Sequence, residues 1–547
     1  MRKTKISTIL LSVASLALLA SCSNQGGDDS TGGSGNNSGV TLGPSIENLS
    51  DDIQRDSDGN VVFQNVELDM MSVIGAPDNA VLNGLIDQFN TTYEGQIHIN
   101  VNETGQNDYY TSLTQTMESD PESLPDITLM HDHKYSEYAY KNLFYPLEDI
   151  FAKSSSSIDW DDLYSNMATT VTIGQKHYGL PLDGHGTIMI YRQDIIAKNQ
   201  LNVTDGVEWK DSEGNPRYVP QGRDEFRSML QKAQDMKNAG TLQTRNLQEG
   251  GTSAAWTTAN KQTFHPTYWL AMGGNEDGFT MSALYNNNAT ISSVENGGRT
   301  VSFAENAGLK SYMSWMLGMA NEGMMGDTSD YKSDFLTGDT IVAGEGPWNI
   351  STYTAATGTD WASDDSEKNV IGIGNYGGFL TLPENDNGAN ANKWYGTGHA
   401  FGITSHVTSW TKALAASEFM SWLISPQHLA EWSKGGHAPA WKSAYESDIY
   451  KKVLNTKDAT GATLRGIGDP SNIMTLEPIR YPSTVQNGYC DGVIQNVVGG
   501  NMNGIIDTVK YKNLSEDELK AKLDEAVTSL KGVEENINLS LAGFNWD

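Results

Sequence analysis

The chain has 547 residues, of which 68 are acidic and 36 are Lys or Arg, so its formal net charge is −32 at pH 7. An acidic excess of this size argues against binding to a nucleic-acid backbone, because that binding needs clusters of Lys and Arg. The length exceeds what one hydrophobic core usually supports, which predicts two lobes.

The first residues, 1–22, have the pattern of an export signal. A basic start precedes an apolar run from Ile9 to Ala20, which is too short to span a membrane. The small residues before Cys22 resemble the lipobox of bacterial lipoproteins. That resemblance implies cleavage before Cys22 and attachment of acyl chains, palmitate among them, to this residue. The alternative is an ordinary cleaved signal with an incidental cysteine.

A polar lead-in, residues 23–65, follows the signal. Its first part, 23–43, has almost no apolar side chain to bury and is typical of a flexible linker. If Cys22 carries lipid, Cys490 is the one cysteine left in the exported chain, and no internal disulfide can form. Stability must then come from burial of apolar side chains.

Strands and helices alternate in the next part of the chain. Residues 65–75 have the composition of a buried strand, and 78–93 carry apolar residues at helical spacing, with Asp78 as the expected N-cap. Residues 96–103 alternate as a strand does, and 108–119 return to helical spacing. This order predicts an α/β lobe with a parallel sheet.

A further buried strand, residues 124–133, ends in polar residues. Ligands of open α/β sheets bind at the carboxyl ends of the strands, which makes Asp132, His133 and Lys134 candidate binding groups. His131 and His133 fall on one face of this strand and raise the possibility of a metal pair. No third ligand is evident in the sequence, so we expect neither a metal site nor a cofactor.

The apolar segment 179–196 is interrupted by Asp183-Gly184-His185-Gly186. Two glycines around a histidine indicate a backbone that approaches another group closely. Asp183 and His185 are therefore further candidates for hydrogen bonds to a ligand.

Later segments carry clear turn and capping signals. We expect a surface hairpin at 207–219 and a helix at 222–239 that ends at Gly240. Residues 413–436 predict two helices divided at Pro426, and 515–541 predict a long helix that begins with a capping box.

Motifs typical of enzymes and of cofactor or calcium sites are incomplete or absent in the sequence. Residues 372–377, "GIGNYG", satisfy G-x-G-x-x-G but are followed by a strand-like segment, whereas dinucleotide binding needs a helix there. The stretch 56–59, "DSDG", lacks the remaining ligands of a calcium loop. The sequence contains no nucleophile elbow, zincin helix or P-loop, so we do not expect an enzyme.

Several longer segments occur in an informative order. They are "LPDITLM" with "NLFYPLEDI", "HYGLPLDGHGTIMIYRQDII", "DFLTGDTIVAGEGPWNI", "GFLTLPENDNG", and "ALAASEFMSWLISPQHLAEW" with "GGHAPAW". In this order the chain resembles extracellular solute-binding protein family 1, the maltodextrin-binding-like substrate-binding lipoproteins of carbohydrate ABC transporters. The resemblance covers nearly everything from residue 66 onward.

The resemblance implies an α/β fold of the type II periplasmic-binding-protein class, with two discontinuous lobes joined by a hinge. The chain would cross between lobes near Leu182 and Asp183, near Leu382 and Pro383, and at 437–439. The implied lobes are 66–182 with 384–438, and 183–383 with 439–547.

Trp348, in "GEGPWNI", is the main aromatic candidate for ligand contact. An indole after Gly-Pro is more often part of a core, but the resemblance implies that Trp348 stacks on a sugar ring. A pyranose has apolar faces and a belt of hydroxyls, so its site needs flat aromatic surfaces and hydrogen-bonding groups. The other candidates from the later part of the chain are Phe264, Tyr268, Trp394, Tyr395 and His399, with Trp269 and Tyr481 as weaker ones.

These features predict a lipid-anchored receptor on the outer face of the cell membrane. It would be a monomer that captures a carbohydrate, an oligosaccharide in our interpretation, between its lobes and delivers it to an ABC transporter permease. Two alternatives stay open. One is a binder of another solute, such as a polyol phosphate, a peptide or a metal; the other is a lipid-anchored glycan-degrading enzyme.

Overall fold

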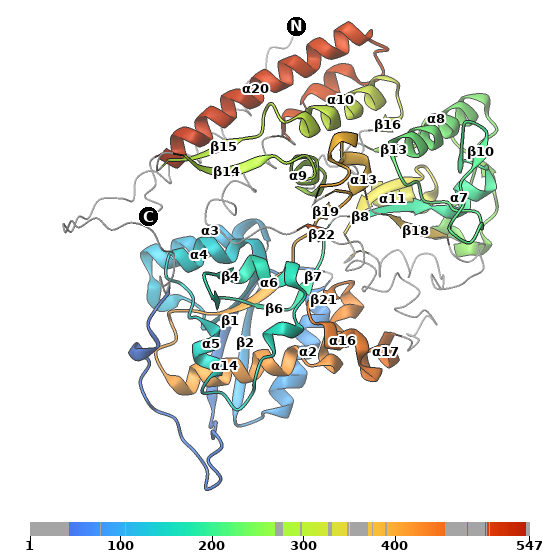
Figure 1. The fold of residues 1–547 in the computed structure, drawn as a ribbon. Coiled ribbons are helices and arrows are strands. Elements are labelled where there is room, and N and C mark those ends of the chain that lie inside the picture. Colours follow the sequence, from blue (N-terminus) through green and yellow to red (C-terminus); the bar gives the residue numbers. More distant parts are fainter. Residues whose placement is uncertain are drawn as a thin grey trace, which may run out of the picture.

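The computed structural model describes residues 43–76, 78–103, 106–186, 188–268, 277–295, 298–326, 331–346, 349, 370–374, 376–388, 391–454, 478–479, 498, 500–502 and 504–542. These residues form two bodies, one below and one above in Figure 1. Short strands, among them β7 (Asp183–Gly184) and β21 (Ala438–Pro439), lie where the bodies meet.

The lower body is built on a five-stranded sheet of order β2-β1-β3-β20-β6. Its strands are β1 (Val66–Ser72), β2 (Ile97–Glu103), β3 (Ile127–His131), β20 (His399–Ile403) and β6 (Leu180–Pro181). β1 pairs in parallel with β2 and β3, as the alternation of strands and helices predicts. β20 returns from far along the chain and pairs antiparallel with β3 and β6, so distant segments meet in one sheet.

Helix α2 (Asn79–Thr92) covers this sheet with an apolar stripe of Leu82, Leu85, Ile86 and Phe89, all buried. Its expected cap does not form, because the Asp78 side chain makes no capping hydrogen bond. The Asp78 carboxylate instead lies 2.8 Å from His437 Nε2. A polar group at the start of the helix is thus connected to the region between the bodies.

The two helices predicted on either side of Pro426 are present as α14 (Trp410–Leu423) and α15 (Pro426–Trp432). They pack against β1 and α2, respectively. Helices α16 (Lys442–Glu446) and α17 (Asp448–Leu454) then pack against α15. The sequence assigned residues from 439 onward to the second lobe; we propose that the chain up to 454 belongs with the first.

The remaining elements of the lower body are one longer helix and several short helices and strands. They are α3 (Gln106–Ser119), α4 (Tyr135–Tyr140), α5 (Leu147–Phe151), α6 (Ser165–Val171), β4 (Thr172–Ile173), β5 (Lys176–His177) and the 3-10 helices η2 (Ile46–Asn48), η3 (Pro121–Ser123), η4 (Asp132–Lys134), η5 (Trp160–Asp162) and η11 (Ser433–Gly435).

The upper body contains a three-stranded antiparallel sheet with β8 (Ile188–Arg192) between β17 (Val342–Glu345) and β18 (Ile371–Gly374). All five residues of β8 are buried, which matches the apolar segment that follows the Asp-Gly-His-Gly interruption. After β18 the chain forms a four-residue helix, α13 (Gly377–Leu380), where the sequence predicted a strand. The antiparallel pairing of β18 still excludes a βαβ dinucleotide unit at this point.

Two predictions about the outer surface of this body are confirmed. Helix α8 (Arg223–Ala239) ends at Gly240, whose φ of 73° is left-handed and favours glycine. The hairpin expected at 207–219 is present as a bridge between Lys210 and Pro216, and the Asp211 carboxylate accepts backbone hydrogen bonds at its tip. The first two residues of the expected range, β10 (Val207–Glu208), pair with β9 (Val203–Thr204).

A long C-terminal helix, α20 (Glu516–Ala542), lies along α10 (Ala307–Asn321) and the strand β15 (Gly298–Ser302), which pairs with β14 (Thr290–Glu295). The capping box is confirmed, because the Ser515 backbone N–H donates to Glu518 Oε2 at 2.9 Å and the Glu518 backbone N–H donates to Ser515 Oγ at 3.4 Å. Other elements of the upper body are α7 (Gln193–Lys198), β11 (Gln243–Thr244), η6 (Leu247–Glu249), η7 (Gly251–Ser253), β12 (Thr257–Thr258), β13 (Thr267–Tyr268), α9 (Asp277–Tyr285), β16 (Met325–Gly326), α11 (Tyr331–Thr337), η10 (Pro383–Asn385), β19 (Trp394–Tyr395) and β22 (Pro478–Ile479).

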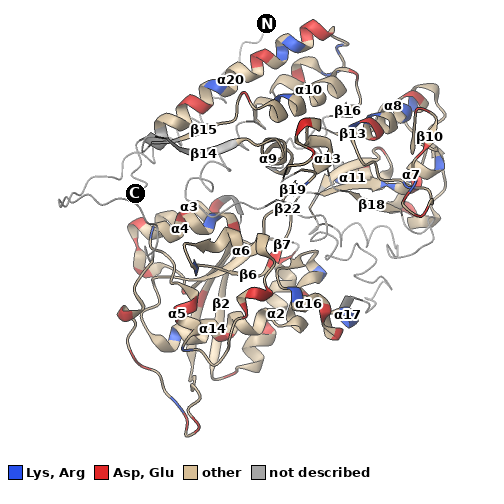
Figure 2. Ribbon diagram, viewed as in Figure 1, with Lys and Arg blue, Asp and Glu red and all other residues tan. Residues whose placement is uncertain are grey.

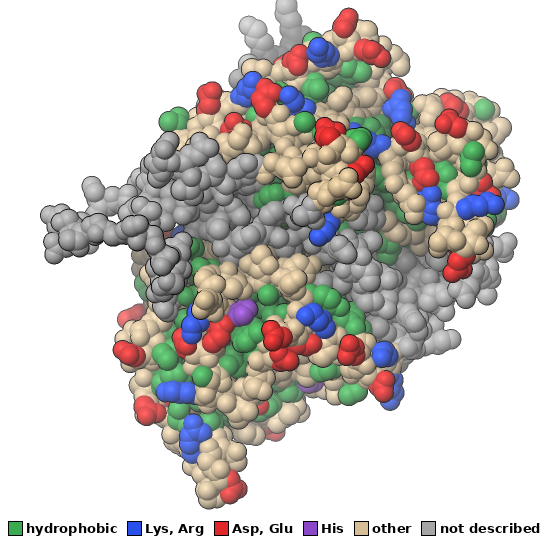
Figure 3. Space-filling view, viewed as in Figure 1, with side chains coloured by type: hydrophobic (Ala, Val, Ile, Leu, Met, Phe, Trp, Pro, Cys, Tyr) green, Lys and Arg blue, Asp and Glu red, His purple; other side chains and the backbone are tan. Residues whose placement is uncertain are grey.

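The acidic excess is spread over the surface. Figure 2 shows Asp and Glu on both bodies, interspersed with Lys and Arg along α20 and α8, and Figure 3 shows the same mixture on one face of the molecule. Across the part of the chain that the structure describes, no helix combines the length and the apolar character needed to cross a membrane.

A buried ionic cluster of Arg192, Asp194 and Arg245 connects β8 with neighbouring segments of the upper body. Arg192 Nε and Nη2 each lie 2.9 Å from an Asp194 oxygen, and Arg245 Nε lies 2.8 Å from Asp194 Oδ2. Burial raises the pKa of Asp194, but the two guanidinium groups outweigh it and lower the pKa below its ordinary value.

We predict that Asp194→Asn destabilises the upper body by about 3–5 kcal/mol, because it leaves a buried guanidinium without its counter-charge. The measurement is urea unfolding. The matched control is Glu322→Gln, which breaks an exposed pair with Arg227 and should cost less than about 1 kcal/mol. If the two substitutions lower the free energy of unfolding equally, the buried cluster does not stabilise the protein more than an exposed ion pair does.

The same carboxylate makes stability depend on pH. Because its pKa is lower in the folded than in the unfolded protein, the Asp194 contribution is present above the unfolded value of about 3.9 and is lost as the pH falls below it. The stability difference between the wild type and Asp194→Asn should therefore be constant from about pH 7 to about pH 5 and shrink as the pH falls further to about pH 3. A difference that stays constant would contradict this account.

Candidate functional site

Three segments that are distant in the sequence meet between the bodies. β7 pairs antiparallel with β21, and His185 forms a bridge with Thr397 just before β20. The first residue of β20, His399, is paired with His131 at the carboxyl end of β3. Polar residues from the crossing segments and from the main sheet are thereby brought to one place.

The Asp183 carboxylate lies at the centre of this region and is fully buried. Its oxygens accept hydrogen bonds from the His399 backbone N–H at 3.0 Å and from Trp432 Nε1 at 2.7 Å. His399 Nδ1 lies 3.0 Å from Oδ2, and His185 Nδ1 lies 3.3 Å from Oδ1. His437 Nδ1 lies 3.4 Å from Oδ2. Three imidazoles thus face one carboxylate.

The histidine rings are packed against one another. The ring centroids of His185 and His399 are 4.4 Å apart and stacked, and each lies 5.4 Å from His437. His131 is 5.1 Å from His399, and His133 is 5.6 Å from His131. Five of the ten histidines of the chain therefore form one cluster, which we call the hinge histidine cluster.

The charge states of this cluster follow from burial and from Asp183. Burial lowers the pKa of His185 to about 3, and burial also holds the pKa of His131 well below its ordinary value. Burial acts the same way on His437, but the carboxylates of Asp183 and Asp78 outweigh it and raise its pKa. The pKa of Asp183 is raised by burial and lowered more strongly by the surrounding imidazoles, so it falls well below the ordinary range.

Asp132, His133 and Lys134 form the 3-10 helix η4 directly after β3, at the carboxyl end where the sequence predicted binding groups. Asp132 is buried, and its Oδ2 accepts a hydrogen bond from Thr170 Oγ1 at 3.1 Å. His133 and Lys134 are half-buried, and Lys134 Nζ lies 5.5 Å from the Tyr110 ring centroid.

Trp394 and Tyr395 form β19, and both are buried. The Tyr395 backbone N–H donates to Ser282 Oγ of α9 at 2.8 Å, so these residues lie with the upper body. The sequence placed 384–395 in the first lobe; we propose that this segment belongs with the second. The Trp394 ring lies against Gly186, next to His185 in the first crossing segment, and leaves no room for a Cβ at that position.

Phe264 and Tyr268 lie within the upper body, away from the hinge histidine cluster. Phe264 is fully buried, and the Tyr268 hydroxyl donates to Asp334 Oδ2 at 2.8 Å. Both rings are covered by protein in this structure. Trp348, Trp269, Tyr481 and Cys22 lie outside the described residues, so their roles stay predictions.

Sequence reasoning missed three members of the central arrangement: His437, Trp432 and Asp78. One signal was present, because "GGHAPAW" puts a histidine at the third expected crossing while "DGHG" puts one at the first. The two histidines lie about 250 residues apart in the sequence, and no local pattern predicts that they come into contact.

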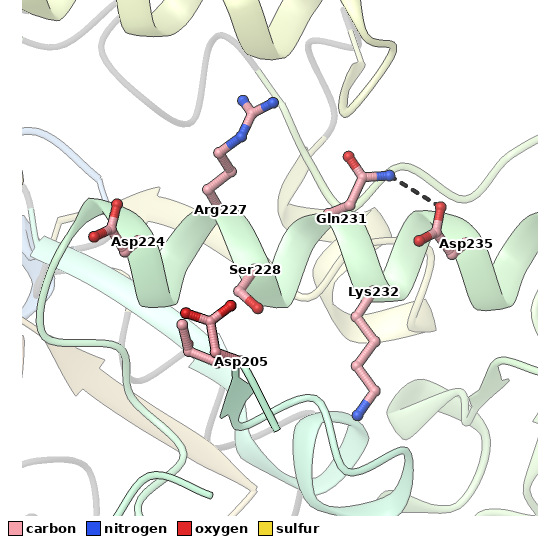
Figure 4. Close-up of a pocket in the computed structure, with 8 residues that line it drawn as sticks. Asp205, Asp224, Arg227, Ser228, Gln231, Lys232 and Asp235 are labelled. Atoms are coloured by element: carbon pink, nitrogen blue, oxygen red, sulfur yellow. Dashed lines mark hydrogen bonds between the residues drawn. The ribbon is translucent and has the colours of Figure 1, made fainter. Parts of the chain in front are cut away.

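A separate groove of about 540 Å³ lies on the outer face of the upper body, between α8 and β9 (Figure 4). It is lined by Thr204, Asp205, Asp224, Arg227, Ser228, Gln231, Lys232 and Asp235, and the Gln231 amide donates to Asp235 Oδ1 at 2.9 Å. This lining contains no aromatic side chain, so the groove lacks the flat apolar surface that a sugar ring needs.

Comparison with protein families finds a match over residues 84–457 to the family described as bacterial extracellular solute-binding protein. This range includes the three positions at which the chain was expected to cross between lobes. A comparison of the sequence with curated proteins finds no match.

Solved structures with the same fold cover most of the chain at low sequence identity. A cyclic α-maltosyl-1,6-maltose binding protein from Arthrobacter globiformis is 15% identical, with a TM-score of 0.56, over 86% of this chain and 99% of its own. The galacto-N-biose-/lacto-N-biose I-binding protein of Bifidobacterium longum is 13% identical, with a TM-score of 0.56, over 86% and 97%. The GacH receptor of Streptomyces glaucescens is 12% identical, with a TM-score of 0.54, over 85% and 98%. The expected type II periplasmic-binding-protein fold is thus confirmed.

We predict that Gly186→Ala destabilises the protein by about 1–3 kcal/mol, because a Cβ at this position would clash with the Trp394 ring and lie 3.0 Å from the Tyr395 carbonyl oxygen. Urea unfolding measures the loss. The control is Gly84→Ala in α2, where a Cβ meets no atom within 4 Å. Gly84→Ala should raise the free energy of unfolding by about 0.5–1 kcal/mol. A similar gain in Gly186→Ala would refute the close packing of Gly186 against Trp394.

Proposed function

Because the chain belongs to the family of bacterial extracellular solute-binding proteins, we propose that it captures a carbohydrate between its two lobes and delivers it to an ABC transporter permease. The observation that carries the proposal is the extent of the family match. It spans residues 84–457 and so includes all of the expected crossing segments, on which closure of two lobes around a solute depends.

A sugar is the solute class that we favour. The structural relatives named above are described as binders of cyclic maltosyl-maltose, lacto-N-biose and acarbose, all of them carbohydrates. The chain also has 13 Trp and 23 Tyr residues, which are the side chains that present a flat face and a polar group to a sugar ring.

We propose fewer residues as contacts for the sugar than the sequence alone offered. Asp183, His185 and His399 are buried, and each histidine is hydrogen-bonded to Asp183, so in our proposal they support the hinge and have little surface for a ligand. His133 and Lys134, half-buried at the carboxyl end of β3, supply polar groups at the edge of the sheet. Trp348 is proposed as the stacking partner on the strength of the family resemblance.

The proposed mechanism is a shift between open and closed arrangements of the lobes. A sugar that contacts both lobes only when they are closed stabilises that arrangement, and the permease then recognises it. Dissociation at about 1 μM corresponds to about 8 kcal/mol, which stacked rings and several charge-assisted hydrogen bonds can supply after the cost of ordering.

Two further parts of the proposal concern the cell surface. Lipid on Cys22 would hold the protein at the outer face of the cytoplasmic membrane, and the polar segment 23–43 would act as its tether. We also propose that the protein works as a monomer and is not an enzyme.

A glycan panel tests the proposal by thermal shift and calorimetry. We predict that at least one oligosaccharide stabilises the wild-type protein and that Trp348→Ala weakens its binding at least tenfold, about 1.4 kcal/mol, through loss of the stacking surface. Trp256→Ala is the matched control, since Trp256 lies beside Arg245 in the upper body.

The panel also contains polyol phosphates and peptides. If one of these compounds binds and no glycan does, the protein is a binder of another class of solute. Release of shorter sugars during incubation would identify an enzyme, and unchanged affinity in Trp348→Ala would remove that residue from the site.

A further inference from the structure

We propose that Asp183, His185, His399 and His437 bind one divalent cation of the zinc class at the junction of the two lobes. One donor atom from each residue lies within 4.8 Å of the donors of the other three, and all four residues are buried. Three imidazoles with one carboxylate form a donor set that suits Zn²⁺ and similar first-row ions. This proposal does not rest on the nature of the transported solute.

The second ring nitrogens of two of the three histidines, His437 and His185, support the assignment. His437 Nε2 lies 2.8 Å from Asp78 Oδ2, and His185 Nε2 lies 3.1 Å from Thr397 Oγ1. With a proton on each Nε2, these nitrogens donate outward, and each Nδ1 presents a lone pair to the centre. Metal-binding histidines are held in this way by a hydrogen bond from the other ring nitrogen, often to a carboxylate.

Hydrogen bonding without a cation leaves the cluster incompletely satisfied. The Asp183 carboxylate has about four acceptor positions. It already serves the His399 backbone N–H and Trp432 Nε1, while three imidazole Nδ1 atoms also face it. The His437 side chain is 1% exposed, and its Nδ1, which lies 3.4 Å from Asp183 Oδ2, makes no hydrogen bond. A cation at the centre would use this nitrogen.

The donor atoms of the four residues lie farther apart than they would around a bound ion. Donors bound at about 2.0–2.1 Å around a tetrahedral ion lie roughly 3.3 Å apart, compared with separations of up to 4.8 Å here. Binding must therefore draw the side chains inward. Because Asp183 and His185 come from the first crossing segment and His437 precedes β21, that contraction would fix the crossing segments against β20.

This inference differs from the metal pair considered in the sequence. That pair was His131 and His133, and the sequence showed no third ligand. The proposed site takes neither residue. His131 Nδ1 is hydrogen-bonded to the Tyr110 hydroxyl at 2.7 Å, and His133 is not among the four residues whose donor atoms converge. The members of the new set come from three segments separated by up to 254 residues, between 183 and 437.

The test is titration of the purified protein with Zn²⁺ after removal of metal by a chelator. We expect binding of one Zn²⁺ per chain by calorimetry and elemental analysis, and a tetrahedral absorption spectrum when Co²⁺ replaces it. Titration of the wild type decides the proposal even if a variant fails to fold. Absence of stoichiometric Zn²⁺ binding by the wild type would overturn it.

Three variants then locate the site. His437→Asn and His399→Asn should remove stoichiometric binding, and Asp78→Asn, which changes the outer contact alone, should weaken it about 10–100-fold. His98→Asn is the control, because His98 is an exposed histidine on β2. Undiminished Zn²⁺ affinity in the His437 and His399 variants would also overturn the proposal. Sugar titrations with and without chelator test the proposed function separately. Sugar binding by a protein that binds no Zn²⁺ would overturn the cation site and leave the proposed function standing.

Discussion

The structure between the lobes depends on one buried carboxylate. Asp183 is fully buried, and its charge is retained because imidazoles, an indole N–H and a backbone N–H surround it. A charge at this depth is tolerated in proteins only with such compensation. The compensating groups come from the first crossing segment, from β20 and from the segment before β21, so satisfying Asp183 also determines how these segments meet.

The hinge and the lobes are stabilised by different interactions. Each lobe has a core of apolar side chains around its sheet, together with individual buried charges such as the Arg192–Asp194 pair. The crossing region instead contains hydrogen bonds and closely spaced rings over short strands of two residues each. Polar contacts of this kind are directional, and a buried network whose groups are satisfied holds the segments in one arrangement.

Local patterns predicted much of the fold because they depend on neighbouring residues. The alternation of strands and helices in 65–119, the break at Pro426 and the end of α8 at Gly240 are all found in the structure. Predictions failed where tertiary contacts competed with local preference. Asp78 does not cap α2 because its carboxylate pairs with His437, and Gly377–Leu380 forms a helix where a strand was expected.

The sequence by itself determined the alternation of strands and helices and the position of polar residues after β3, since each is encoded within short stretches. The type II fold class followed from the family that the order of its segments resembles. The tertiary structure alone decided that Asp183, His185, His399 and His437 converge, and that Phe264 and Tyr268 are enclosed within the upper body. The physical reason is that a strand pattern specifies which side chains are buried, but not which partner strand they face. That choice is made when β20 and β21 return from more than 200 residues away to pair with β3 and β7.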